Sequence, residues 1–230
     1  AENLAWKLDR VLRGQADASL IATYGAEREY AADENILNST RATDFITPKS
    51  EISRLFRDAA LTLAKNHPFA RSIVNSGRLS VPAVLKESGL NTAADAAFEG
   101  RMEPGAPAAD APVLLPDGSA GWLLRQLRSG EFTALVHGDG NHLPELDRAA
   151  ELLRDAAEGI ATLRVLRIGA QGTEPAAVSV VDAEGLIAQR YDLQPGTVVL
   201  LRPDQHVCAR WRKPNADGLR AALRTALALA

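Results

Sequence analysis

Two histidines and an aspartate lie close together in the stretch HGDGNH, where His137, Asp139 and His142 carry side chains that bind metal ions. Their spacing matches no known ligand motif, and glycine-rich turns often carry Asp, Asn and His for backbone reasons. The same stretch lacks the lysine and the Ser or Thr of a phosphate-binding loop. We therefore predict a turn here and no metal site.

Nucleophilic chemistry has equally weak candidates. Ser50, Ser53 and His67 are residue types of a hydrolase triad, but the chain contains no G-x-S-x-G elbow. Cys208 is the only cysteine, so neither an internal disulfide nor a C-x-x-C redox pair can form. It lies in the apolar run HVCARW, which predicts a buried structural thiol.

The composition is that of an ordinary globular protein. The chain has 230 residues, 46% of them hydrophobic, and 26 basic against 29 acidic residues. No run of like charges predicts binding to nucleic acid or to an anionic membrane. No apolar stretch reaches the ~20 residues that span a bilayer, and no signal-peptide core is present. Together with the single cysteine, this favours a cytoplasmic protein.

The N-terminal region is predicted to be helical throughout. In the first helix, residues 2 to 13, an apolar stripe of Leu4, Leu8, Val11 and Leu12 indicates the buried face. Three further helices follow: one from a cap at Asp17 to about residue 41, one from a cap at Thr47 to about residue 66, and one over residues 69 to 76.

A change in composition divides the chain. Residues 80 to 118 are rich in Gly, Pro and Ala and have no period, which predicts an extended linker. Beyond it, strands at 132–138 and 162–169 flank a helix, a hairpin with a turn at 202–205 follows, and a helix over 216–229 ends the chain. This order predicts an α/β fold, α+β over the whole chain, with a thioredoxin-like core. The predicted domains are 1–79, 80–118 and 119–230.

Two signatures in the correct order resemble FAD-dependent aromatic-ring hydroxylases, the family of phenol hydroxylases and hydroxyphenylpropionate hydroxylases. The first is NLAWKL, residues 3 to 8, with YGAER at 24 to 28 on the next helix. The second is YDLQPGTVVLLRPDQHVCARWR at the other end, which resembles the terminal signature of a thioredoxin-like C-terminal domain.

The resemblance implies that the parent enzyme hydroxylates phenolic compounds with FAD, NAD(P)H and oxygen. The family's G-x-G-x-x-G loop is absent from this sequence, and Met102 is the only methionine. We therefore expect a C-terminal fragment without catalytic, cofactor-binding or metal-binding residues of its own. Its role would be structural, with the missing N-terminal flavin domain as partner and a homodimer as a further form of association.

Some residues keep two interpretations. Glu27 and Arg28 form either a solvated helix face or, by resemblance, a structural pair that ties the helix to the flavin domain. Arg202, Asp204 and Arg210 around the hairpin suit turn and sheet-edge roles, or a contact to a partner domain.

Two structural details follow from the expected folds. Thioredoxin folds carry a cis proline at the place of Pro195, which predicts a cis Gln194–Pro195 bond. Trp6 lies opposite the leucine stripe, so we expect it to be exposed, or buried only by another molecule; alternatively, it covers the stems of neighbouring arginines.

The alternative to the hydroxylase reading is an autonomous, redox-inactive thioredoxin-like interaction module. It has no connection to flavin chemistry.

Overall fold

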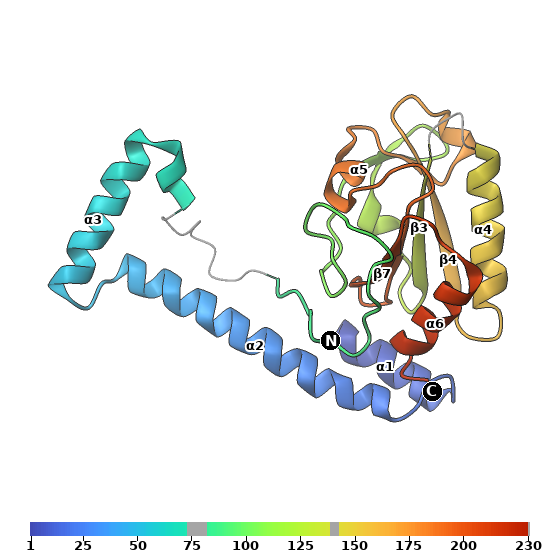
Figure 1. Ribbon diagram of the computed structural model, residues 1–230, viewed down its shortest axis with the longest axis horizontal. Helices are drawn as coiled ribbons and strands as arrows, with labels where there is room; N and C mark the ends of the chain where they lie inside the picture. Colours follow the sequence, from blue (N-terminus) through green and yellow to red (C-terminus); the bar gives the residue numbers. More distant parts are fainter. Residues whose placement is uncertain (73–81, 139–142, 230) are drawn as a thin grey trace. The chain divides into compact units, whose positions relative to one another are not determined.

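The computed structural model describes residues 1–72, 82–138 and 143–229. The chain divides into two compact units: Ala1–Glu27 together with Val84–Ala230, and Arg28–Ala83. We call the first the α/β body and the second the helical unit (Figure 1). The predicted domains, 1–79, 80–118 and 119–230, place the boundaries elsewhere and stay a prediction.

The helical unit contains the C-terminal part of α2 (Ser19–Ile46), α3 (Glu51–Asn66) and the 3-10 helix η1 (Pro68–Ser72). The end of α3 agrees with the prediction, but its cap does not. The Ser50 hydroxyl accepts a hydrogen bond from the Ser53 backbone N–H, whereas Thr47 donates its hydroxyl to the Thr43 carbonyl of α2. Thr47 therefore lies at the C-terminal end of the preceding helix, which runs to Ile46 and so beyond the predicted residue 41.

A mixed sheet forms the centre of the α/β body. Its strand order is β2-β1-β5-β4-β3-β6-β7, with β3 and β4 parallel and β6 antiparallel to both β3 and β7. The strands are β1 (Pro112–Leu114), β2 (Ala120–Trp122), β3 (Phe132–Gly138), β4 (Leu163–Gly169), β5 (Val180–Val181), β6 (Val198–Leu201) and β7 (Val207–Trp211). The predicted α/β class is confirmed, with strands and helices in the expected order from β3 onward.

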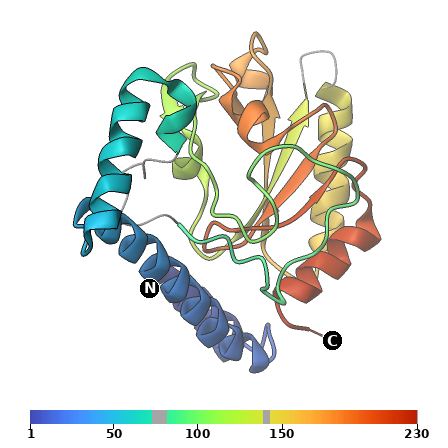
Figure 2. The ribbon, with the colours of Figure 1, turned by 60° about the vertical axis from the view of Figure 1, so that its left-hand side comes forward.

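Helices cover both faces of this sheet (Figure 2). On one face α1 (Glu2–Leu12), α4 (Leu143–Ala157) and α6 (Ala216–Ala226) pack on Phe132, Ala134 and Val136 of β3. On the other face α5 (Leu186–Tyr191) packs against Leu135. Because successive strand side chains alternate between faces, one strand supplies both layers, and every residue of β3 is buried.

The described part of the predicted linker packs closely on the sheet edge. The Gly105 backbone N–H donates to the Val207 carbonyl at 2.7 Å, and Val207 donates to Ala106 at 2.8 Å. Gly105 has φ +95°, and an added Cβ there would lie 2.4 Å from the Leu85 carbonyl oxygen. This segment covers the edge strand β7, which would otherwise present unpaired backbone groups.

Three local predictions need correction. The Gln194–Pro195 bond is trans, since no cis peptide occurs among the described residues. The predicted helix at 69–76 is a 3-10 turn as far as Ser72, and the rest lies outside the described residues. The β1–β2 hairpin, which begins in the predicted linker and ends just beyond it, was not predicted, because its strands have only three residues each and show no alternation.

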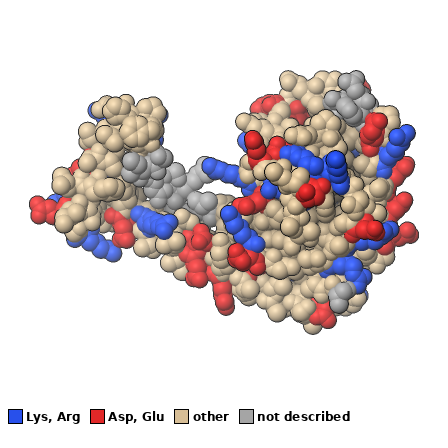
Figure 3. Space-filling model, in the orientation of Figure 1, with Lys and Arg blue, Asp and Glu red and all other residues tan. Residues whose placement is uncertain are grey.

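The surface carries both signs of charge. Figure 3 shows acidic and basic side chains interspersed on the visible face, in agreement with the formal net charge of −3. No helix in the described ranges has the length and hydropathy needed to cross a membrane.

Candidate functional site

Four charged side chains are buried together inside the α/β body. Lys7 comes from α1, Glu27 from α2, and Arg202 and Asp204 from the turn between β6 and β7. Their side chains are at most 2% exposed. Two positive and two negative groups make this buried charge cluster formally neutral, so the charges compensate one another without water.

Glu27 is the centre of the cluster. One carboxylate oxygen accepts hydrogen bonds from Arg202 Nη1 at 2.6 Å and from Ser88 Oγ at 2.6 Å. The other accepts from Lys7 Nζ at 2.8 Å, Asn3 Nδ2 at 2.8 Å and Arg202 Nη2 at 3.1 Å. Such dense donation to a buried carboxylate is what keeps it ionised.

Arg202 and Asp204 complete the network. Arg202 donates to Asp204 from Nε at 3.0 Å and from Nη2 at 2.7 Å, and Asn3 donates to Asp204 at 2.6 Å. The guanidinium therefore binds two carboxylates at once, a geometry that its planar fork allows and a lysine would not.

Trp6 borders the cluster, and its predicted exposure is wrong. It is 4% exposed and buried by its own chain, with its ring edge-on to Phe132 at a centroid distance of 6.1 Å. Arg202 Cζ lies 5.8 Å from the Trp6 ring centroid. The predicted leucine stripe is not the buried face: Leu8 is 36% and Leu12 83% exposed, while Leu4 and Val11 are half-buried.

Burial and pairing shift the pKa values of the cluster in defined directions. Burial alone would raise the pKa of Glu27, but the hydrogen bonds and charge of Arg202, with those of Lys7, lower it to about 2. Burial lowers the pKa of Lys7, a shift that Glu27 opposes. The pKa of Asp204 is well below its ordinary value despite burial, because His206 and Arg202 bind the carboxylate. Glu27, Asp204 and Arg202 are therefore charged at neutral pH, because pairing lowers the pKa of both carboxyl groups and raises that of the guanidinium.

We expect acid to weaken the α/β body through Glu27. Its folded pKa of about 2 lies below the ordinary value of 4.5, so its contribution is complete above pH 4.5 and is lost as the pH falls toward 2. Urea unfolding at a series of pH values should show a loss of a few kcal/mol over this window. The Glu27→Gln variant, which cannot titrate at this position, should show a shallower decline. Equal slopes for both proteins would contradict this assignment.

The other residue types that the sequence analysis weighed lie apart wherever the structure describes them. Ser50 and His67 lie at opposite ends of α3, roughly 25 Å apart at 1.5 Å per residue. His137 is buried at the end of β3, whereas Asp139 and His142 lie outside the described residues. No group of three metal-binding side chains occurs within the described ranges.

Cys208 and Arg210 make packing and hydrogen-bond contacts within the α/β body. Cys208 is buried as predicted, and burial raises the pKa of its thiol to about 12. Arg210 stacks over Phe98 at 4.4 Å and donates to the Met102 carbonyl, so it holds the segment along β7. Arg28 is exposed, so Glu27 acts in the cluster without its neighbour.

Sequence reasoning missed Asn3, Lys7 and Ser88 as members of the network. A signal existed for the first two. Asn3, Trp6, Lys7 and Arg10 have the helical spacing i, i+3, i+4, i+7, just as the leucine stripe has the helical spacing i, i+4, i+7, i+8, and they form the buried face of α1. The prediction chose the face with the leucine stripe because it is the more hydrophobic one, but the other face of α1 is buried. Nothing in the sequence indicates Ser88.

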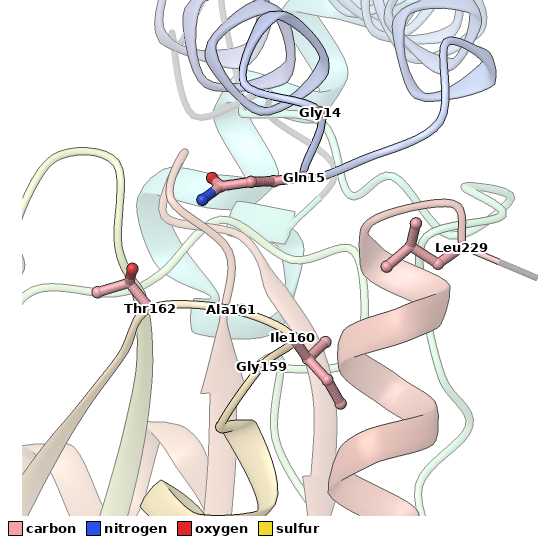
Figure 4. Close-up of a pocket in the computed structure, with 7 residues that line it drawn as sticks. All are labelled: Gly14, Gln15, Gly159, Ile160, Ala161, Thr162 and Leu229. Atoms are coloured by element: carbon pink, nitrogen blue, oxygen red, sulfur yellow. The ribbon is translucent and has the colours of Figure 1, made fainter.

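A surface pocket of about 470 Å³ is lined by the loop after α1, the turn after α4 and the end of the chain (Figure 4). Gly14 and Gln15, between α1 and α2, form one side, and the turn at 159–162 and Leu229 form the other. Among these described lining residues there is no Lys or Arg, and the FAD pyrophosphate needs positive or backbone donor groups such as a glycine-rich helix start. The pocket therefore offers no charged side chain for the FAD pyrophosphate among its described lining residues.

Comparisons with known proteins agree with the fold. A family model described as a FAD binding domain matches residues 1–39. The chain is 28% identical over 237 residues to 3-(3-hydroxy-phenyl)propionate/3-hydroxycinnamic acid hydroxylase 2 of Burkholderia vietnamiensis, covering 96% of this chain and 41% of that protein. A Burkholderia cenocepacia hydroxylase of the same kind is 26% identical, with the same coverage. The chain thus spans about two fifths of these relatives.

Solved structures show which fold this is. The flavin-dependent monooxygenase PieE, in complex with FAD and substrate, matches 97% of this chain and 42% of its own with a TM-score of 0.63 and 22% identity. Aklavinone-11 hydroxylase, with FAD and aklavinone, matches 98% and 38% with a TM-score of 0.63 and 23% identity. The fold is that of part of the flavin-dependent monooxygenases. The predicted resemblance to FAD-dependent aromatic hydroxylases is thereby confirmed.

Proposed function

We propose that this chain is the C-terminal part of a FAD-dependent monooxygenase that hydroxylates aromatic, phenolic compounds with NAD(P)H and oxygen. The observation that carries the proposal is the similarity over 96% of this chain to hydroxylases named for hydroxyphenylpropionate and hydroxycinnamate. FAD would supply the oxygen chemistry from the remaining part of such a protein. The residues of this chain supply no step in that chemistry.

The role of this part would be structural. The arrangement β3-α4-β4 followed by the β6–β7 hairpin and α6, in strand order β4-β3-β6-β7, supports a thioredoxin-like core. A thiol reaction is not available to it, because the only cysteine is buried and thiolate formation is strongly disfavoured. The core would serve packing and subunit association.

The helical unit offers a surface for the flavin domain. On α3 only Ala60 is buried, while Ile52, Leu55 and Phe56 are 82%, 72% and 59% exposed. A one-sided apolar stripe of this size needs a covering partner. The FAD binding domain match extends into this unit along α2, to residue 39, which favours the flavin domain over a second copy of the chain as that partner.

Flavin spectroscopy on the intact gene product tests the proposal. We expect it to bind FAD and to oxidise NADH or NADPH faster when a phenolic acid such as 3-(3-hydroxyphenyl)propionate is added. The 230-residue chain, purified alone, serves as control and should bind no flavin. An intact product that is colourless and cannot be reconstituted with FAD would contradict the hydroxylase and favour the autonomous interaction module. Light scattering that shows a strictly monomeric intact protein would count against the role in subunit association.

A further inference from the structure

The chain leaves and re-enters the α/β body at a single buried carboxylate. Glu27 is the last residue of the body before the helical unit, and the body resumes at Val84. Ser88, just after this return, donates its hydroxyl to Glu27 at 2.6 Å. Glu27 and Ser88, which are 61 positions apart in the sequence, are therefore in direct contact where the chain leaves and re-enters the body. We call this contact, together with its bonds to Arg202, the neck.

Residues 1–27 also contact the body through many groups other than the neck. Asn3 binds Asp204, Trp6 packs on Phe132, and Arg10 donates to the Gly130 carbonyl. Leu20, at the start of α2, is completely buried in the same core cluster. This segment thus has both apolar burial and charged hydrogen bonds to residues more than 100 positions away.

Residues 1–27 are joined covalently to the rest of the α/β body only through the helical unit. The contacts described above do not involve the helical unit. Every partner named above lies in Val84–Ala230 or in the segment itself. Loss of the contacts would leave Arg202 and Asp204 buried with incomplete pairing, which is costly in a water-free environment. The segment therefore has a strong physical reason to stay in place even when the chain between residues 28 and 83 is cut.

We propose that residues 1–27 are an integral, non-covalently held part of the α/β body and that Glu27 closes the neck of the helical unit. Most of the FAD binding domain match, residues 1–39, then belongs structurally to the α/β body. In the parent hydroxylase, and resting on the proposed function, this interface attaches the flavin domain to the body. The interface itself is a property of this chain and requires no flavin.

Cleavage of the full chain in the helical unit tests the interface. A recognition sequence for a site-specific protease is inserted at residues 47–50, between α2 and α3. After cleavage of the folded protein, the N-terminal piece should coelute with the C-terminal piece on a native size-exclusion column and separate from it in urea. Separation on the native column would overturn the proposal.

Variants identify the contacts responsible for retention. Ser88→Ala removes one hydroxyl donor and should raise the dissociation constant of the cleaved pieces about tenfold, while Glu27→Gln should raise it more. Ser88→Ala is mild enough to keep the uncut protein folded, which circular dichroism verifies. The matched control is Arg57→Met, which removes an ion pair with Asp58 and a 3.2 Å hydrogen bond to the Ile46 carbonyl across the cut. It should leave retention unchanged if the contacts of residues 1–27 hold the pieces together.

The reverse pattern would also overturn the proposal. If Arg57→Met weakened retention and the two neck variants did not, packing of α2 on α3 would hold the pieces together. None of these readouts depends on FAD or on hydroxylation, so a colourless parent protein would leave this result standing.

Discussion

The Arg202→Met variant should lose about 3–5 kcal/mol of unfolding free energy in the α/β body. Arg202 is completely buried and makes four hydrogen bonds, two to Glu27 and two to Asp204. Methionine keeps much of the volume but donates nothing. Glu27 then keeps Lys7, Asn3 and Ser88 as partners, and Asp204 keeps Asn3 and His206, so the two buried carboxylates lose their strongest shared cation. Urea unfolding followed by tryptophan fluorescence measures the loss, because Trp6 lies against the guanidinium.

The control for this variant is an ion pair of the same length on the surface. Arg13 Nε lies 2.6 Å from Asp9 Oδ1, but the Arg13 side chain is 67% exposed. Water and salt screen this pair, so Arg13→Met should change stability by less than about 0.5 kcal/mol. Equal effects at Arg13 and Arg202 would show that burial does not determine the strength of the cluster.

The Trp6→Ala variant should cost about 3–5 kcal/mol, the usual range for truncation of a buried tryptophan. The indole packs on Phe132 and is adjacent to Lys7 and Arg202, so its removal leaves a cavity beside the charge cluster. Thermal or urea unfolding followed by circular dichroism gives the measurement, since the variant loses a fluorescent reporter.

Leu12→Ala is the matched change on the opposite face of the same helix. Leu12 is 83% exposed, and we expect a change within about 0.5 kcal/mol. A larger loss at Leu12 than at Trp6 would restore the leucine stripe as the buried face and contradict the arrangement of α1. The pair therefore tests which side of α1 packs on the sheet.

Local signals predicted most of the secondary structure. The two parallel strands, the helix between them and the hairpin with Pro203 at its turn are where the pattern indicated, because strand alternation and turn chemistry act over a few residues. Asp17 binds the Ser19 backbone N–H at 2.8 Å, as a predicted cap does. The predicted N-cap of α3 at Thr47 is wrong because Ser50, three residues later, has the same hydroxyl group and caps the helix instead.

The charge cluster was not predictable in this way. Glu27 and Arg202 are 175 residues apart, and neither is unusual within its own helix or turn. Only the folded sheet brings the β6–β7 turn beneath α1 and α2. Glu27 was rightly singled out, but Arg28 was the wrong partner, because neighbours on a helix point in directions about 100° apart.

The sequence by itself determined that the chain is α/β, which segments are helices and strands, and that it resembles FAD-dependent aromatic hydroxylases. Those properties follow from short-range periodicity, turn residues and the order of short motifs. The tertiary structure alone decided which face of α1 is buried and how the charges pair. Both stripes of α1 have helical spacing, and the polar one is buried because Glu27, Asp204 and the Gly130 carbonyl accept its hydrogen bonds. A helix buries the face whose groups find partners, and those partners come from distant parts of the chain.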